Sequence, residues 1–231
     1  MKLIASKVAI LAIVSFAAGP LLAGEPIPVR NCTWCHGTSA QGFATAPRLA
    51  GQRDQYIANQ LLSFSNHSRD NPYSKQYMWG AVANLSPETA HDLAAYFSML
   101  PPKAANDGDR DLVAVGRTIY EQGIPDSNIV SCLVCHGPNA EGVREIPRLG
   151  GLAYSYLKRR LEQWGEGFHA AAEPMPRIAN KLSPNEIEAL ASYLSFVEYD
   201  PLQSERDCVA NADDGIGLPC LGRKVAAPRL Q

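Results

Sequence analysis

The sequence has no excess of basic residues, no second long apolar run, and no stretch in which apolar and polar residues alternate as in a β-strand. It contains 21 Lys and Arg against 23 Asp and Glu, a formal net charge of −2. Loss of an N-terminal segment with Lys2 and Lys7 would leave 19 basic residues (21 − 2). Nucleic-acid binding is therefore not expected, because it normally requires a basic face. The missing alternation predicts an all-α fold.

The one long apolar run lies at the N-terminus. Lys2 and Lys7 precede apolar residues 8–18, and a small residue, Ala23, follows. This order is typical of a secretory signal peptide, residues 1–23, and the run is shorter than a transmembrane helix requires. We expect cleavage near Ala23, no transmembrane span afterwards, and a periplasmic mature chain. An uncleaved anchor is the alternative, because Leu21 is larger than the residue usual at that position.

Four of the six cysteines fall in two CxxCH motifs, 32–36 and 132–136. Two cysteines three positions apart can form thioethers with both vinyl groups of one porphyrin, while the next histidine reaches its iron. A thioredoxin-like site would need a strand before the motif, and a zinc site needs four ligands around one ion. Each motif is therefore predicted to attach one haem covalently. The predicted haem-binding residues are Cys32, Cys35, His36, Cys132, Cys135 and His136.

The segments that follow the two motifs repeat each other, which indicates two homologous domains rather than one domain with two sites. The offset changes from 100 to 97, so the copies differ by three residues in length between Leu61 and Met78, in an expected surface loop. At an offset of 100 the matches include Pro47/Pro147, Arg48/Arg148, Gly51/Gly151, Tyr56/Tyr156 and Leu61/Leu161. At an offset of 97 they include Met78/Met175, Ser86/Ser183, Pro87/Pro184 and Tyr96/Tyr193.

Methionine is scarce, and two of the four are matched between the repeats. Met1 is the initiator, and Met99, at the end of an apolar helix, is expected to fill space in the core. Met78 and Met175 each follow a haem motif, and a thioether is a soft ligand suited to haem iron. We predict that they are the second axial ligands. The alternative is that they fill the core, as most methionines do.

The other histidines are not expected to bind iron. His67 and His169 precede the matched methionines, but they do not occupy the same position of the repeat. His91 lies beside Asp92 on an expected helix and is predicted to be a surface residue.

Apolar spacing and capping residues predict helices around the sites. Residues 54–64 and 154–164 each place apolar side chains on one face. Ser183, Pro184 and Glu186 form a capping-box helix start, and Ser86-Pro87 begins the matching helix. Pro101-Pro102 ends that helix, and residues 103–110 are predicted to be a polar, flexible linker.

Residues 31–197 resemble the class I cytochromes c, and as a tandem pair they resemble the dihaem cytochrome c4 family. The resemblance rests on CxxCHG, PxLxG, a helix with a tyrosine, a later methionine and the sequence LSxxEIxALAxYLS. It implies two tandem class I cytochrome c domains, each enclosing one covalently attached haem, plus a C-terminal extension. The implied divisions are 24–100, first domain; 101–110, linker; 111–198, second domain; 199–231, extension.

The resemblance also implies that the carbonyls of Pro47 and Pro147 accept hydrogen bonds from the motif histidines. Two features depart from the family pattern. The second domain has a leading helix, 111–122, with Gly116 and Tyr120 available for close packing, whereas the first domain has only residues 24–31 before its motif.

The second departure is the extension, with Cys208 and Cys220, which are predicted to form a disulfide in an oxidising compartment. Our hypothesis is that this extension covers the surface left bare by the missing first helix. The alternative is that it docks a partner or has no specific role.

The leading functional hypothesis is a periplasmic carrier of single electrons between respiratory partners, which by resemblance are a quinol-oxidising complex and a terminal oxidase. An alternative is the cytochrome subunit of a periplasmic dehydrogenase, such as a flavocytochrome c sulfide dehydrogenase. A dihaem enzyme is less favoured, because two methionine ligands leave no open position at iron. No catalytic residues are predicted.

Overall fold

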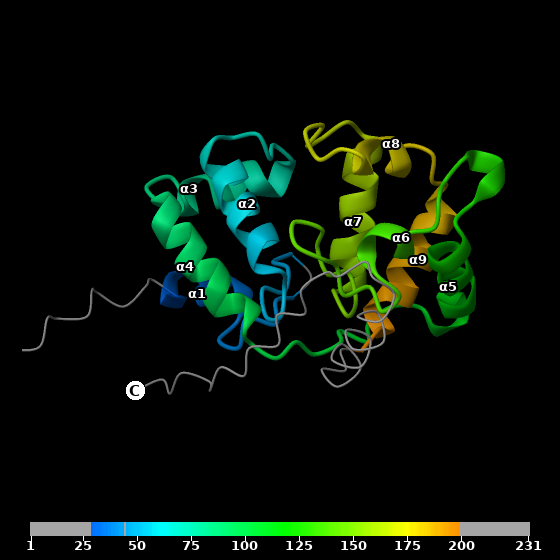
Figure 1. Ribbon diagram of the computed structural model, residues 1–231, viewed down its shortest axis with the longest axis horizontal. Helices are drawn as coiled ribbons and strands as arrows, with labels where there is room; N and C mark the ends of the chain where they lie inside the picture. The colour runs from blue at the N-terminus through cyan, green and yellow to red at the C-terminus, as the bar shows by residue number, and fades with distance from the viewer. Residues whose placement is uncertain (1–28, 44, 199–231) are drawn as a thin grey trace, which may run out of the picture.

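The computed structural model describes residues 29–43 and 45–198, which form two helical domains side by side (Figure 1). The described residues contain no strand, only two isolated bridges, so the all-α prediction is confirmed. The first domain consists of α1 (Val29–His36), α2 (Asp54–Ser65), the π-helical turn η1 (Ser74–Met78), α3 (Trp79–Ala81) and α4 (Pro87–Ser98). The second consists of η2 (Arg110–Leu112), α5 (Val113–Gln122), η3 (Pro125–Ser127), α6 (Leu133–His136), α7 (Tyr154–Gly165), α8 (Met175–Ala179) and α9 (Pro184–Phe196).

The predicted signal peptide, the extension and the proposed pair Cys208 and Cys220 lie outside the described residues. Any contact between the extension and the first domain also lies outside the described residues. Within 29–43 and 45–198, no helix combines the length and the apolar character that crossing a membrane requires.

The first domain is built on the packing of α2 against α4. Ile57 and Ala58 on α2 are buried against Leu93 and Phe97 on α4, as the apolar spacing predicts. The N-terminus of α4 is capped by Ser86, whose Oγ accepts a hydrogen bond from the Thr89 N–H at 3.2 Å. The predicted helix start is confirmed.

The second domain repeats this pair as α7 and α9 and adds α5, which crosses α9. A Cβ atom at Gly116 would collide with the Ala189 carbonyl oxygen, so the two helix backbones touch at this glycine. Tyr120 is fully buried on the same helix, and its hydroxyl donates to the Gly137 carbonyl at 2.5 Å. At the start of α9, Ser183 and Glu186 form the predicted capping box.

The segment between the domains, predicted to be a flexible linker, is hydrogen-bonded to the second domain. Its backbone donates in turn to the Gly151 carbonyl, the Ser195 carbonyl and the Ser195 hydroxyl, through Ala105, Asn106 and Gly108 at 3.0–3.1 Å. Polar composition indicates that a segment avoids the core, but it does not show whether a neighbour supplies hydrogen-bond partners. The connection runs along the second domain instead of hanging free (Figure 1).

We expect the substitution Gly116→Ala to destabilise the second domain by about 1–3 kcal/mol, because the methyl group forces α5 away from α9. Thermal unfolding of the haem-containing protein, followed by circular dichroism, measures this. The matched control is Gly165→Ala on α7, where the nearest heavy atom to an added Cβ lies at 3.8 Å. The control should be neutral or slightly stabilising, because Ala favours helix over Gly. Equal losses in both variants would contradict the close packing of α5 on α9.

Candidate haem-binding sites

Each motif histidine is buried and held by one hydrogen bond. Nδ1 of His36 lies 2.7 Å from the Pro47 carbonyl oxygen, and Nδ1 of His136 lies 2.9 Å from that of Pro147. Both side chains are only 7% exposed. The hydrogen bonds implied by the family resemblance are therefore confirmed. A carbonyl can only accept, so Nδ1 carries the proton and Nε2 keeps its lone pair.

Electrostatics favour the neutral form of both imidazoles. Burial lowers the pKa of His36 and of His136, and the hydrogen bond to the proline carbonyl offsets this only in part. Both imidazoles are therefore neutral at pH 7. A neutral imidazole with a fixed Nδ1–H and an available Nε2 is the form that binds a metal ion.

The backbone after each motif is folded in the same way. Gly37 and Gly137 have φ of +83° and +81°, where a side chain would be strained, and the carbonyl of each histidine accepts a hydrogen bond at 2.8 Å six residues later. The residue directly before the second cysteine is exposed in both copies. Trp34 is 84% exposed and Val134 is 72% exposed, so one edge of each site reaches the surface.

The matched methionines are half-buried and begin or end a short helix. Met78 is the last residue of η1, and Met175 is the first residue of α8, where it packs on the core of the second domain. Met99, in contrast, is 50% exposed, so the expectation that it fills the core is wrong. It follows the last turn of α4, whose apolar face ends at Phe97, and there it points to solvent.

The remaining histidines have other contacts. His67 stacks on Trp79, with ring centroids 4.0 Å apart, and His91 is exposed as predicted. His169 is buried, and its Nδ1 accepts a hydrogen bond from Arg160 at 3.2 Å. Burial, followed by the nearby charges of Arg69 and Arg160, lowers the pKa of His169 to about 4.

The two domains exchange hydrogen bonds through the arginines that follow the two prolines. Arg48 donates through Nη2 to the Gly151 carbonyl, and Arg148 donates through Nε to the Gly51 carbonyl at 3.0 Å. Both arginines are almost completely buried. The two matched arginines therefore bind the two matched glycines, each in the other domain. The interface follows the same repeat as the two sites.

One further contact at this interface has no counterpart. The Gln52 side chain accepts from the Arg148 N–H at 2.7 Å and donates to the Arg148 carbonyl at 3.0 Å. The position matched to Gln52 in the second repeat is Leu152. Gln52 therefore binds the peptide groups next to Pro147, whose carbonyl orients His136. Sequence reasoning missed these interface residues, although the matched Arg48 and Arg148 were a signal.

Three buried hydrogen-bond donors bear on whether a haem fits these sites. Arg48 Nε, Arg69 Nε and Trp164 Nε1 have no hydrogen-bond partner within the described part of the protein. Buried donors are nearly always paired, so these atoms indicate an acceptor beyond the polypeptide. Burial lowers the pKa of Arg48 and nearby Asp107 raises it in part, which leaves the pKa at about 10. The guanidinium is therefore still a cation at neutral pH. The two carboxylates of a haem would supply acceptors of the right charge.

Comparison with known proteins agrees with this geometry. A family model described as cytochrome c matches residues 22–101 and 113–197. Cytochrome c-552 of Acidithiobacillus ferridurans is 31% identical, over 75% of this chain and 77% of its own. The thiosulfate dehydrogenase electron acceptor of Thiomonas intermedia is 32% identical, over 85% and 92%. The cytochrome c4 structure from Acidithiobacillus ferrooxidans is 30% identical with a TM-score of 0.68, and the match covers 72% of this chain and 98% of that one.

The chain therefore belongs to the cytochrome c family, with two cytochrome c domains in tandem. Within that family it is a dihaem cytochrome of the cytochrome c4-like group. It carries two covalently attached haem c groups and transfers electrons, and one of its relatives is named as an electron acceptor. Redox proteins are its partners.

We expect the substitution Gln52→Leu, which copies Leu152, to destabilise the interface between the domains. It removes both hydrogen bonds to the buried Arg148 peptide groups, at a cost of about 1–3 kcal/mol for each group left unsatisfied. Denaturant unfolding of the holoprotein measures the loss.

The control for this variant is Gln55→Leu, at an exposed position of the same segment, which should change stability by less than about 0.5 kcal/mol. If Gln52→Leu proves as stable as the control, the two hydrogen bonds of Gln52 do not contribute to the interface.

Proposed function

We propose that each haem is held by the two cysteines and the histidine of its motif and by the matched methionine. In the first domain (24–100) these are Cys32, Cys35, His36 and Met78. In the second (111–198) they are Cys132, Cys135, His136 and Met175. The single observation that carries the proposal is the matched hydrogen bond of His36 and His136 to a proline carbonyl, because it leaves Nε2 of each ring available to bind iron.

The residues of the chain then have distinct tasks. When bound, each haem iron would alternate between ferric and ferrous and so carry one electron. Pro47 and Pro147 keep the histidines in the tautomer that binds iron. Arg48 and Arg69 would offset the negative charge of the haem carboxylates, and the thioethers of Met78 and Met175 would raise the reduction potentials.

We expect Met78→Ala and Met175→Ala each to change the ligand signature of one haem in optical and magnetic spectra, and to lower the reduction potential of that haem. Axial ligands set haem potentials over roughly 0.8 V, so loss of a thioether is readily measured in a redox titration. The control is Met99→Ala, at an exposed methionine. An unchanged signature in either test variant would disprove the assignment of that methionine.

We propose further that the physiological electron donor is a dehydrogenase of the thiosulfate dehydrogenase type. The alignment with the electron acceptor of Thiomonas intermedia covers 85% of this chain, against 75% for the alignment with cytochrome c-552, and so extends further along it. This donor is a particular case of the periplasmic dehydrogenase considered as the alternative to a free carrier. Export by a cleaved signal peptide, residues 1–23, would place the chain in the periplasm beside such a donor.

Mixing the oxidised cytochrome with a purified thiosulfate dehydrogenase and thiosulfate should reduce both haems, as measured by stopped-flow absorbance. The rate should exceed that with a flavocytochrome sulfide dehydrogenase and sulfide. Co-elution with the dehydrogenase in gel filtration would show that the chain is a stable subunit, and separate elution with fast reduction would show a mobile carrier. No reduction beyond the rate of thiosulfate alone would rule out this donor.

A further inference from the structure

The segment that leads from α2 to Met78 contacts the second domain at three successive places. All three contacts come from the stretch 69–73 and meet α7 or the loop that follows it. The contacts are a hydrogen bond from Arg69 Nη2 to the Tyr156 hydroxyl (3.3 Å), one from the His169 N–H to Asp70 Oδ1 (2.7 Å), and the packing of the Arg159 guanidinium on the Tyr73 ring (4.7 Å to the centroid).

Arg69 is also tied to the backbone around Met78. The indole Nε1 of Trp79, the residue next to Met78, donates to the Arg69 carbonyl at 2.9 Å. The Trp79 N–H donates to the Ser74 carbonyl and closes the turn η1 that contains Met78. A displacement of Arg69 therefore moves the turn that carries the methionine.

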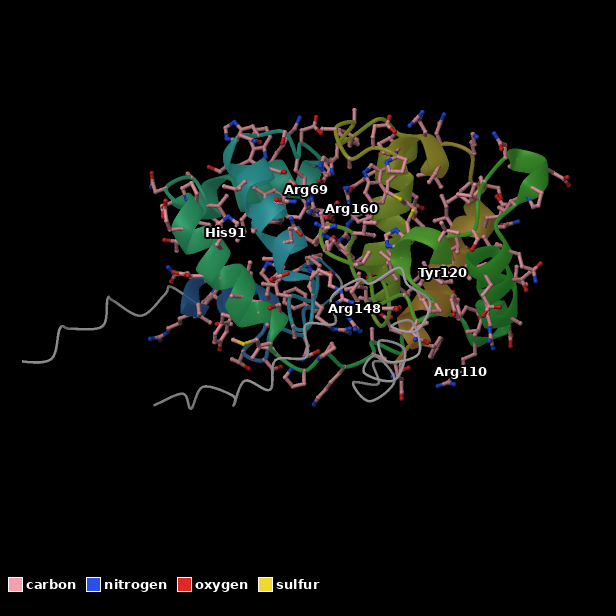
Figure 2. All side chains as sticks on the ribbon, viewed as in Figure 1. Arg69, His91, Arg110, Tyr120, Arg148 and Arg160 are labelled. Atoms are coloured by element: carbon pink, nitrogen blue, oxygen red, sulfur yellow. The ribbon has the colours of Figure 1, made fainter. Side chains whose placement is uncertain are left out.

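The contact between Arg69 and Tyr156 is buried and charge-assisted. Arg69 and Arg160 lie next to each other between the domains (Figure 2), and both are almost completely buried. Burial alone would raise the pKa of Tyr156, but the guanidinium groups of Arg69 and Arg160 outweigh it and lower that pKa. Hydrogen bonds of this kind are stronger than neutral ones. Arg69 Nη1 is held at 2.5 Å by Gln60 of its own domain.

The segment before Met175 is held in a different way. His169 Nδ1 accepts from Arg160 Nη2 at 3.2 Å, and Arg160 Nη1 donates to Gln163 at 2.9 Å, all within the second domain. The backbone N–H of His169 is the part of this segment that reaches across, to Asp70. The segment before Met175 is thus held mainly by its own domain. The segment before Met78 is hydrogen-bonded to the other domain.

We propose that Tyr156, a residue of the second domain, is a positioning residue for Met78 in the first. Its hydroxyl fixes Arg69, Arg69 fixes Trp79, and Trp79 fixes the turn that presents the sulfur. This inference rests on the proposed function, because it takes Met78 as the axial ligand. It makes the ligand geometry of the first haem depend on the second domain, whereas the segment before Met175 is hydrogen-bonded to Arg160 rather than to Tyr156.

The test is Tyr156→Phe in the full-length holoprotein, with proton NMR of the ferrous state. The two axial methionine methyl signals are first assigned with Met78→Ala and Met175→Ala. In Tyr156→Phe the Met78 signal should shift while the Met175 signal stays. Imidazole should displace the Met78 thioether roughly two- to tenfold faster than in the wild type, the change expected for loss of one buried hydrogen bond.

Two further variants make the result decisive. Tyr154→Phe applies the same chemical change on the same helix, at a ring that packs on the second core, and should alter neither signal. Arg69→Lys keeps the charge but loses the planar fork and should act like Tyr156→Phe. Unchanged Met78 signals in both test variants, or equal changes at both methionines, would overturn the positioning role. If Met78→Ala itself removes no signal, the ligand assignment fails, and this proposal fails with it.

Discussion

One hydrogen bond in each domain, from the imidazole of the motif histidine to a proline carbonyl, determines how the rest of the structure is arranged. It spans 11 residues and closes the loop between the motif and the segment that follows. The proline carbonyl orients the histidine, and the very next residue is the arginine that crosses to the other domain. Haem site and domain interface are therefore built from adjacent residues. Neither can be altered without affecting the position of the other.

Local signals in the sequence predicted the helices that support the sites, because caps and apolar spacing act within a few residues. The capping box at Ser183 and the packing of Tyr120 are examples. The arginine network was not predicted, since Arg69 and Tyr156 are 87 residues apart and their meeting depends on how two domains dock. Surface exposure of Met99 was missed for a related reason: helix ends are placed by their surroundings, not by composition. The signal peptide and the domain divisions stay predictions.

The duplication has left two copies that resemble each other at the iron and differ around it. Near the first motif two large apolar residues, Trp34 and Phe43, are exposed; the matched residues near the second are Val134 and Val143, which are also exposed. Gln52 binds across the interface, whereas Leu152 is a core residue. The two motif histidines keep the same hydrogen bond in both copies. The residues around the sites differ more between the two copies, and such surroundings can tune the potential of a haem.

The hydrogen-bonded connection between the domains leaves no slack in the chain. Together with the hydrogen bonds of Arg48 and Arg148, it ties the two domains to each other. Tunnelling of an electron between two centres depends steeply on their distance. Transfer of an electron between the two bound haems would therefore not require one domain to move against the other.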